Sequence, residues 1–249
     1  MISFASLLPY SPELISLKEK NKISEAFKDV NQLVNELKPD ILLTISSQGP
    51  PLKQAFSLNL CQEYKIDFKD LGDLKTKILL QGNLELNYKI KENFEINFPQ
   101  TPLTMITEPE LDSSLAVPLY YLYQKYKNFS LIPIHSCLLD YQKHFDFGQQ
   151  LKEELVLTNK KIGLIVPWEF REKSFDKDLE KKVLKNIKQK NLQALVKINP
   201  ELITKAKITD FSSLLILSGI LKDLNYQLEI IKPQSFLELA QLGLIFKLS

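Results

Sequence analysis

The sequence predicts a single-domain, three-layer α/β/α protein with a central, mostly parallel (mixed) sheet. Short apolar runs alternate along the chain with amphipathic helical patterns. Strands that are separated by helices favour parallel pairing, with helices covering both faces of the sheet. No repeat, low-complexity segment or Ser/Gly/Pro-rich linker interrupts the 249 residues. We therefore expect one domain over residues 1–249.

The expected strands are short apolar runs that end at proline, glycine or polar residues. Four runs are too continuous for a sheet with one solvated face, so we expect them to be neighbours in the sheet. These four runs are Ile2–Leu8, Ile41–Ser46, Phe129–Ile134 and Lys161–Val166. Further strand-like or short apolar runs are Ala55–Leu60, Lys77–Leu80, Thr104–Thr107, Tyr226–Ile231 and Leu242–Leu248.

The expected helices show apolar residues at helical spacing, in two cases after a capping residue. Ser24 is the expected N-cap of a helix over Glu25–Leu37, and one residue of 112–114 can cap a helix over Leu115–Tyr126. Residues 214–221 are apolar enough to serve an interface. The other predicted helices are Leu84–Phe94, Tyr141–Leu155, Asp176–Lys190 and Ser212–Leu221.

Composition excludes several classes of function. The net charge is +2 and Arg171 is the only arginine, so we expect no nucleic acid and no membrane as partner. The seven glycines form neither GxGxxG nor Gly-Lys-Ser/Thr, so the two common nucleotide-binding loops are absent. Two histidines and two cysteines cannot be arranged as a zinc finger or ribbon. Such sparse cysteines predict reduced thiols and a cytoplasmic location.

Ligands bind sheets of this class beyond the carboxyl ends of the strands. That rule selects Tyr10, Gln48, His135, Trp168 and Glu169, each of which lies just after or at the end of a predicted strand. Trp168 is the only tryptophan and adjoins a carboxylate. Two interpretations stay open for it: an aromatic anchor in a surface loop, or one wall of a ligand pocket.

The histidines admit alternative interpretations. His135 and Cys137 are separated by one residue and would face the same side of a strand, where they could bind a metal. The alternative is a histidine satisfied by a backbone carbonyl beside a buried thiol that behaves as a small apolar group. His144 lies at the start of a helical pattern, where we expect a structural role.

Ordered segments along nearly the whole chain carry a family resemblance. Phe4–Pro12 is an apolar strand with a Pro-x-x-Pro end, and Leu37–Asp40 precedes Ile45–Pro50. Asp112–Tyr120, Tyr141–Gly148 and Ile198–Ile203 follow in order. The set resembles class III extradiol ring-cleavage dioxygenases, and more narrowly the LigB-like proteins near the AmmeMemoRadiSam system protein B group. The resemblance implies the LigB-like fold.

The resemblance implies a mononuclear Fe(II), as in active members of that family. Two histidines and a glutamate hold this iron, and it binds a catechol and O2. In this chain the metal histidines fall on Tyr10 and Gln48, and the glutamate falls near Ile208. Two further family histidines fall on Ser113 and Glu172. A phenol and an amide are weak ligands for Fe(II), and an isoleucine offers no donor atom. We therefore expect that the iron site is lost and that no cofactor is bound.

Three functional hypotheses follow. The chain is a degenerate homologue (a pseudoenzyme) with a non-catalytic or changed binding role, an enzyme of altered chemistry in the same cleft, or an active dioxygenase with rearranged ligands. Activity, if present in the last case, would be that of an extradiol oxidoreductase. A homo-oligomer, a protein partner and an unknown small molecule stay open as partners. The expected cleft residues, none with an assigned catalytic role, are Tyr10, Gln48, Ser113, His135, Trp168, Glu169 and Glu172.

Overall fold

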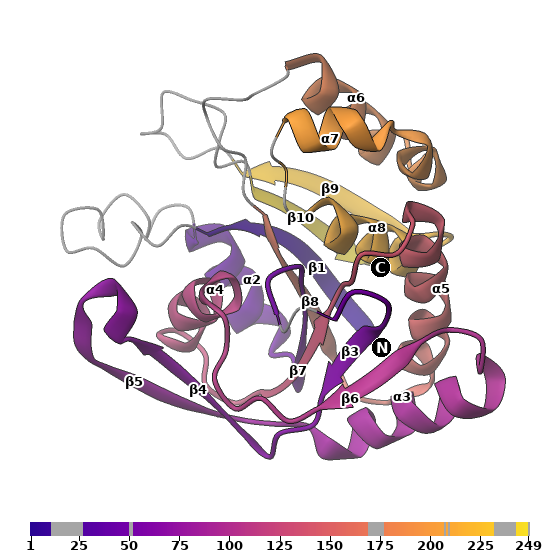
Figure 1. Cartoon of the computed structure of the whole chain (residues 1–249). Coiled ribbons are helices and arrows are strands. Elements are labelled where there is room, and N and C mark those ends of the chain that lie inside the picture. Colours follow the sequence, from indigo (N-terminus) through magenta and orange to yellow (C-terminus); the bar gives the residue numbers. More distant parts are fainter. Residues whose placement is uncertain are drawn as a thin grey trace.

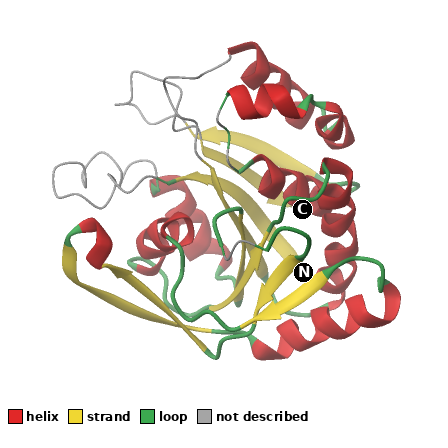
Figure 2. Ribbon diagram, in the orientation of Figure 1, coloured by secondary structure: helices red, strands yellow, loops and turns green. Residues whose placement is uncertain are grey.

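The computed structural model describes residues 1–10, 27–49, 52–168, 177–206, 208, 210–231 and 243–248. An eight-stranded mixed sheet forms the centre of the molecule (Figures 1 and 2). In spatial order its strands are β6 (Leu103–Ile106), β3 (Phe56–Asn59), β7 (Ser130–His135), β2 (Ile41–Ser46), β8 (Ile162–Trp168), β1 (Ile2–Pro9), β10 (Gly243–Leu248) and β9 (Tyr226–Ile231).

The four strands expected to be neighbours are adjacent and parallel, in the order β7-β2-β8-β1. Nearly all of their residues are buried, as continuous apolar runs predict for strands covered on both faces. β10 runs antiparallel to β1 and β9, and β3 runs antiparallel to β7. The predicted three-layer α/β/α class with a mostly parallel, mixed sheet is therefore confirmed.

Two helix layers cover the sheet, and each has its own hydrophobic cluster. On one face lie α2 (Lys28–Leu37) and α4 (Ser113–Tyr123), with a hairpin beside them. The other face carries the remaining helices (Figure 1). These are α3 (Leu84–Asn97), α5 (Tyr141–Leu157), α6 (Lys177–Lys188), the 3-10 helix η4 (Leu192–Lys197), α7 (Pro200–Lys205) and α8 (Phe211–Leu221).

Helix α8 lies in the core and packs closely against α5. A Cβ atom added at Gly148 would lie 2.0 Å from the carbonyl oxygen of Ile216, and one at Gly219 would lie 2.0 Å from that of Phe145. Only glycine permits this approach of the two backbones. Every residue of 214–221 is buried within the chain, so the expectation that this segment could serve an exposed interface is wrong.

The sequence interpretation missed the 3-10 helix η4 and most of a hairpin, in which β4 (Glu63–Phe68) and β5 (Asp73–Gln81) are joined through η2 (Lys69–Leu71). Of this hairpin, only Lys77–Leu80 was expected as a strand. Strand β4 alternates buried and more exposed residues, and charged residues interrupt its apolar pattern. One-sided strands of this kind give a weaker signal than strands buried on both faces.

The remaining differences concern element ends. The described part of α2 begins at Lys28 after Phe27, which makes no side-chain cap, and the expected cap Ser24 lies outside the described residues. Asp112 is the cap of α4, one of the three candidates. Among the residues that the structure describes, no helix is long and apolar enough to cross a membrane.

Candidate functional site

Polar side chains gather where the parallel strands end. The carboxyl ends of β1, β2, β7 and β8 lie along the same edge of the sheet, since these strands are parallel and adjacent. Tyr10 follows β1, residues 47–49 follow β2, and His135 ends β7. This is the edge at which sheets of this class bind ligands.

A chain of hydrogen bonds, here called the strand-end polar chain, joins five residues: Tyr10, Gln48, Ser46, Ser114 and Asp112. The Gln48 amide nitrogen donates to the Tyr10 hydroxyl, and the Gln48 backbone N–H donates to Ser46 Oγ at 3.0 Å. Ser46 Oγ lies 2.9 Å from Ser114 Oγ, which donates to Asp112 Oδ1. The chain thereby ties β1 and β2 to the start of α4.

Asp112 has two functions at the end of this chain. Its Oδ1 caps α4, because it accepts from the backbone N–H of Ser114 at 3.0 Å and of Leu115 at 3.3 Å. Its Oδ2 is buried without a hydrogen-bond partner among the described residues, and it lies 3.8 Å from His135 Nε2. His135 Nδ1 lies 3.0 Å from Ser57 Oγ. One carboxylate thus connects the helix cap to a buried imidazole.

Its surroundings favour the neutral form of His135. Burial lowers the pKa of its imidazole, and the Asp112 carboxylate acts in the opposite direction. The backbone of Gly49 covers the ring so closely that an added Cβ would lie 1.9 Å from His135 Cδ2. Any side chain at residue 49 would displace the ring, so the glycine of the Gln48-Gly49 segment is a packing requirement.

A second polar group lies on the α8 side of the sheet and is here called the hydroxyl cluster. Ser47 Oγ lies 2.7 Å from Ser213 Oγ, and Ser136 Oγ donates to Ser47 Oγ at 3.0 Å. The three serines come from the ends of β2 and β7 and from the first turn of α8. They carry no formal charge, and their hydroxyls can both donate and accept.

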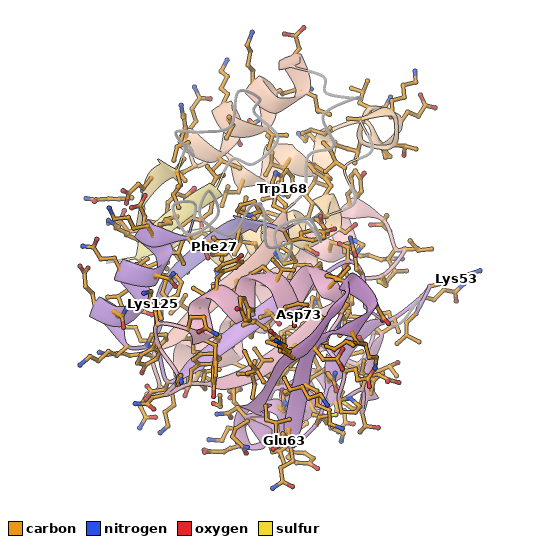
Figure 3. The ribbon with its side chains drawn as sticks, turned by 90° about the vertical axis from the view of Figure 1, so that its left-hand side faces the viewer. Phe27, Lys53, Glu63, Asp73, Lys125 and Trp168 are labelled. Carbon is orange, nitrogen blue, oxygen red and sulfur yellow. The ribbon has the colours of Figure 1, made fainter. Side chains whose placement is uncertain are left out.

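Not every predicted cleft residue lies in this arrangement. Ser113 is the first residue of α4 and follows the cap Asp112. Trp168 ends β8 and is 3% exposed, in the cluster on the α8 side, so it is not in a surface loop. In Figure 3 it lies within the outline of the molecule, whereas Lys53 points outward. Glu169 and Glu172 lie outside the described residues.

The structure also decides between the interpretations of the histidines. Cys137 is buried in the same hydrophobic cluster as Trp168, whereas His135 faces Asp112 and Ser57. A His135–Cys137 metal pair therefore does not form. The expected backbone partner of His135 was wrong, because a serine hydroxyl takes that place. His144 is structural as expected, with ring nitrogens 2.9 Å from the Asp140 carbonyl oxygen and 3.1 Å from that of Cys137.

Sequence reasoning missed the contact between Asp112 and His135 and the participation of Ser57 and Ser213. Asp112 was considered only as a helix cap and as part of a family motif. Ser57 and Ser213 lie in apolar runs, where a serine gives no signal of its own. Their role depends on which strands and helices become neighbours, which no local pattern encodes.

The three positions on which the resemblance places the metal ligands do not suit Fe(II). Tyr10 and Gln48 hydrogen bond to each other, and Ile208 is buried with an apolar side chain. Among the described residues, no three His, Cys, Asp or Glu side chains come together. Fe(II) sites of this family type need two imidazoles and a carboxylate on one face. The donors present at these positions therefore disagree with the metal that the resemblance implies.

Known proteins resemble this chain at three levels. The sequence model of the family described as the catalytic LigB subunit of aromatic ring-opening dioxygenase matches residues 7–239. Protein CA_C1420 of Clostridium acetobutylicum is 22% identical over 252 aligned residues, which cover 90% of this chain and 53% of that protein. The chain therefore spans about half the length of this relative.

One solved structure shows the same fold. The crystal structure of the uncharacterized protein JW3007 from Escherichia coli K12 superimposes with a TM-score of 0.64. The superposition covers 98% of this chain and 99% of that one, at 14% sequence identity. At such low identity the likeness concerns the arrangement of helices and strands, not the chemistry of the site.

Proposed function

This chain belongs to the family of the catalytic LigB subunit of aromatic ring-opening dioxygenases, and we propose that it acts without the iron of that family, as a binding protein. The strand-end polar chain carries this proposal. It includes Tyr10 and Gln48, on which the resemblance places the two metal histidines. The Gln48 amide nitrogen donates to the Tyr10 hydroxyl, so each of these side chains is already oriented by the other.

The ligand of such a site is a small molecule recognised by hydrogen bonds. Gln48 is exposed, and Ser47 and Ser136 are partly exposed, so these three groups can be reached from solvent. An amide and two hydroxyls offer both donors and acceptors without formal charge. The family substrate, a catechol, would lack the cation that binds its oxygens. A neutral, hydroxyl- or amide-bearing compound suits the groups that are present.

A second candidate is an enzyme with metal-free chemistry, and the Asp112–His135 contact favours it. A neutral imidazole can accept a proton at neutral pH, and a carboxylate 3.8 Å away would stabilise the imidazolium that forms. The resulting proton transfer would require a ligand that reaches His135, which is 4% exposed. Because so little of His135 is exposed, we prefer a binding function without catalysis.

Anaerobic Fe(II) titration tests the preferred function directly. The wild-type chain should bind no stoichiometric Fe(II) and should not cleave catechols. A variant with Tyr10→His, Gln48→His and Ile208→Glu should gain affinity. Removing residues that only hydrogen bond to metal ligands lowers metal affinity about 10- to 100-fold. Restoring three ligands should therefore raise the Fe(II) affinity by more than ~100-fold. Ring cleavage should stay absent in the variant, because Ser113 supplies no histidine for proton transfer.

The matched control places the same three changes elsewhere, as Tyr88→His, Gln81→His and Ile96→Glu. These positions are exposed on β5 and α3, away from the strand ends. The control should leave Fe(II) affinity unchanged. Tight binding of one Fe(II) per wild-type chain would refute the proposal and favour a dioxygenase with rearranged ligands. Equal affinities of the site variant and the control would show that the three positions do not share one site.

A further inference from the structure

The hydrogen bonds that link Gln48 to Asp112 in the strand-end polar chain all point in one direction. Ser114 gives its single hydroxyl proton to Asp112 Oδ1, so it must be the acceptor in its contact with Ser46 at 2.9 Å. Ser46 Oγ therefore donates to Ser114, and it accepts in turn from the Gln48 backbone N–H at 3.0 Å. Hydrogen bonds in such a series polarise one another, so their strength depends on the negative charge of the Asp112 carboxylate.

The other oxygen of this carboxylate lies near His135 without a hydrogen bond. Asp112 Oδ2 is buried and has no hydrogen-bond partner among the described residues. Its distance from His135 Nε2 is 3.8 Å, which is about 1 Å longer than a charge-assisted N–H···O bond. A buried oxygen without a donor is unfavourable, because it has lost its contact with water and gained no bond in exchange. The two groups are therefore one short movement away from a hydrogen bond.

The surroundings of the His135 ring offer an acceptor to each nitrogen of an imidazolium, which donates from both. Nδ1 lies 3.0 Å from Ser57 Oγ, and Nε2 faces Asp112 Oδ2. Burial lowers the pKa of His135, and Asp112, at the start of α4, is the charged group that acts against burial. Ser57 on β3 and the backbone of Gly49 after β2 also adjoin the ring, and neither carries a charge.

Asp112 is the partner that moves when this contact closes, because the ring is held in place. A Cβ atom added at Gly49 would lie 2.5 Å from His135 Nε2, and Ser57 contacts the opposite nitrogen. The carboxylate is held through Oδ1 by the backbone N–H and the hydroxyl of Ser114. A shift of Asp112 toward an imidazolium therefore lengthens the bonds from Ser114. The carboxylate charge is then shared with the imidazolium, which weakens the remaining bonds of the series.

We propose that the Asp112–His135 contact is a pH-dependent switch for the strand-end site. When His135 takes up a proton, Asp112 Oδ2 pairs with the imidazolium, and the polar chain holds Gln48 less firmly. Gln48 is the exposed member of the chain, so the change affects a group that a ligand can reach. As a control of ligand binding, this inference rests on the function proposed above.

Amide hydrogen exchange at Gln48, measured by NMR between pH 7 and pH 5, tests the switch without ligand or iron. The ring resonances of His135 report its protonation in the same samples. The protection factor, which is the intrinsic exchange rate divided by the observed rate, removes the direct effect of pH on exchange. We expect the protection of the Gln48 amide to fall about two- to tenfold, the range for one net hydrogen bond. The fall should share its midpoint with the titration of His135.

Two variants separate the switch from general effects of acid. His135→Gln cannot take up the proton, and Asp112→Asn keeps a residue that is favoured at helix caps but has no charge to share. In each variant the protection of the Gln48 amide should be the same at pH 7 and pH 5. The matched control is His144→Gln, since the ring of His144 contacts two backbone carbonyl groups and not Asp112. It should leave the fall at Gln48 intact. Circular dichroism shows which variants are folded, and one of the first two is sufficient.

Four results overturn the proposal. The first is a His135 ring that stays neutral down to pH 5. The second is a Gln48 amide whose protection is unchanged while His135 titrates, which would mean that Asp112 serves both partners at once. The third is a fall with a different midpoint, and the fourth is a fall that persists in His135→Gln or Asp112→Asn. None of these results affects the iron titration, which tests the proposed function by itself.

Discussion

The two ends of the parallel strands are stabilised in different ways. At the carboxyl end, side chains hold the segments together, through contacts such as Ser46–Ser114 and Ser47–Ser213. At the amino end, backbone groups take a larger part. The Met1 ammonium donates to the carbonyl groups of Thr158 and Lys160 at 2.8 and 2.6 Å, and the Lys161 backbone N–H donates to Asp40 Oδ2 at 2.8 Å. Side chains at the carboxyl end therefore depend more on one another than those at the amino end, where many bonds have a backbone partner.

That dependence concerns the two positions at which the resemblance places metal histidines. Gln48 donates through its side chain to the Tyr10 hydroxyl and through its backbone N–H to Ser46 Oγ, which lies 2.9 Å from Ser114 Oγ. A change at either position therefore alters hydrogen bonds that its neighbours share.

The largest effect expected at the carboxyl end is that of Asp112→Ala. It removes a helix cap and the acceptor of Ser114 Oγ, and it leaves His135 without its carboxylate. We expect the free energy of unfolding to fall by about 2 kcal/mol, as the upper range for lost caps indicates. Urea denaturation monitored by circular dichroism measures this change.

The matched control is Asp140→Ala, which removes the cap of α5. Asp140 accepts from the Lys143 N–H at 2.9 Å, but its side chain is exposed and has no comparable network. Its loss should therefore cost about 1 kcal/mol or less. Equal losses for the two variants would show that Asp112 acts as a cap alone and that the strand-end polar chain adds no stability.

An intermediate effect concerns pH. Burial lowers the pKa of both His135 and His144 below the ordinary value of 6.5. In mildly acidic solution the unfolded chain therefore binds more protons than the folded one. The stability associated with the neutral imidazoles is complete above pH 6.5 and decreases as the pH falls from there toward the folded pKa values.

Unfolding measurements between pH 7 and pH 5 should show this loss. His135→Gln should reduce the pH dependence of the free energy of unfolding. The double variant His135→Gln, His144→Gln should reduce it further, because these are the two histidines of the chain. Carboxyl groups titrate mainly below this window, since their ordinary pKa values are near 4. An unchanged slope in the double variant would mean that neither imidazole is buried in its neutral form.

The smallest expected effect belongs to the amino end. Leu157→Ser changes a side chain that is 77% exposed, so the chain should keep its stability within about 0.5 kcal/mol. Leu155→Ala, two residues earlier in the same helix, removes a fully buried side chain and should cost about 2–5 kcal/mol. A large loss for Leu157→Ser would mean that this leucine packs within its own chain.

Local sequence patterns were sufficient to predict the class of fold and its central strands. Ile2–Leu8, Ile41–Ser46 and Lys161–Val166 are recognisable because strands buried on both faces must be apolar at every position, a local property. The hairpin of β4 and β5 escaped for the converse reason, since its half-exposed strands alternate with charged residues. The ordered family motifs also placed Tyr10 and Gln48 at strand ends, where the structure brings them into contact.

The contacts of those residues, in contrast, depend on how the elements pack together. His135 meets Asp112 because β7 and the start of α4 converge at one edge, and Ser213 meets Ser47 because α8 is packed against α5 through Gly148 and Gly219. Serine and aspartate occur equally well in caps, turns and solvated faces, so their types alone do not specify a partner. Contacts between segments more than 20 residues apart depend on how the helix layers pack on the sheet, and packing is a property of the whole chain.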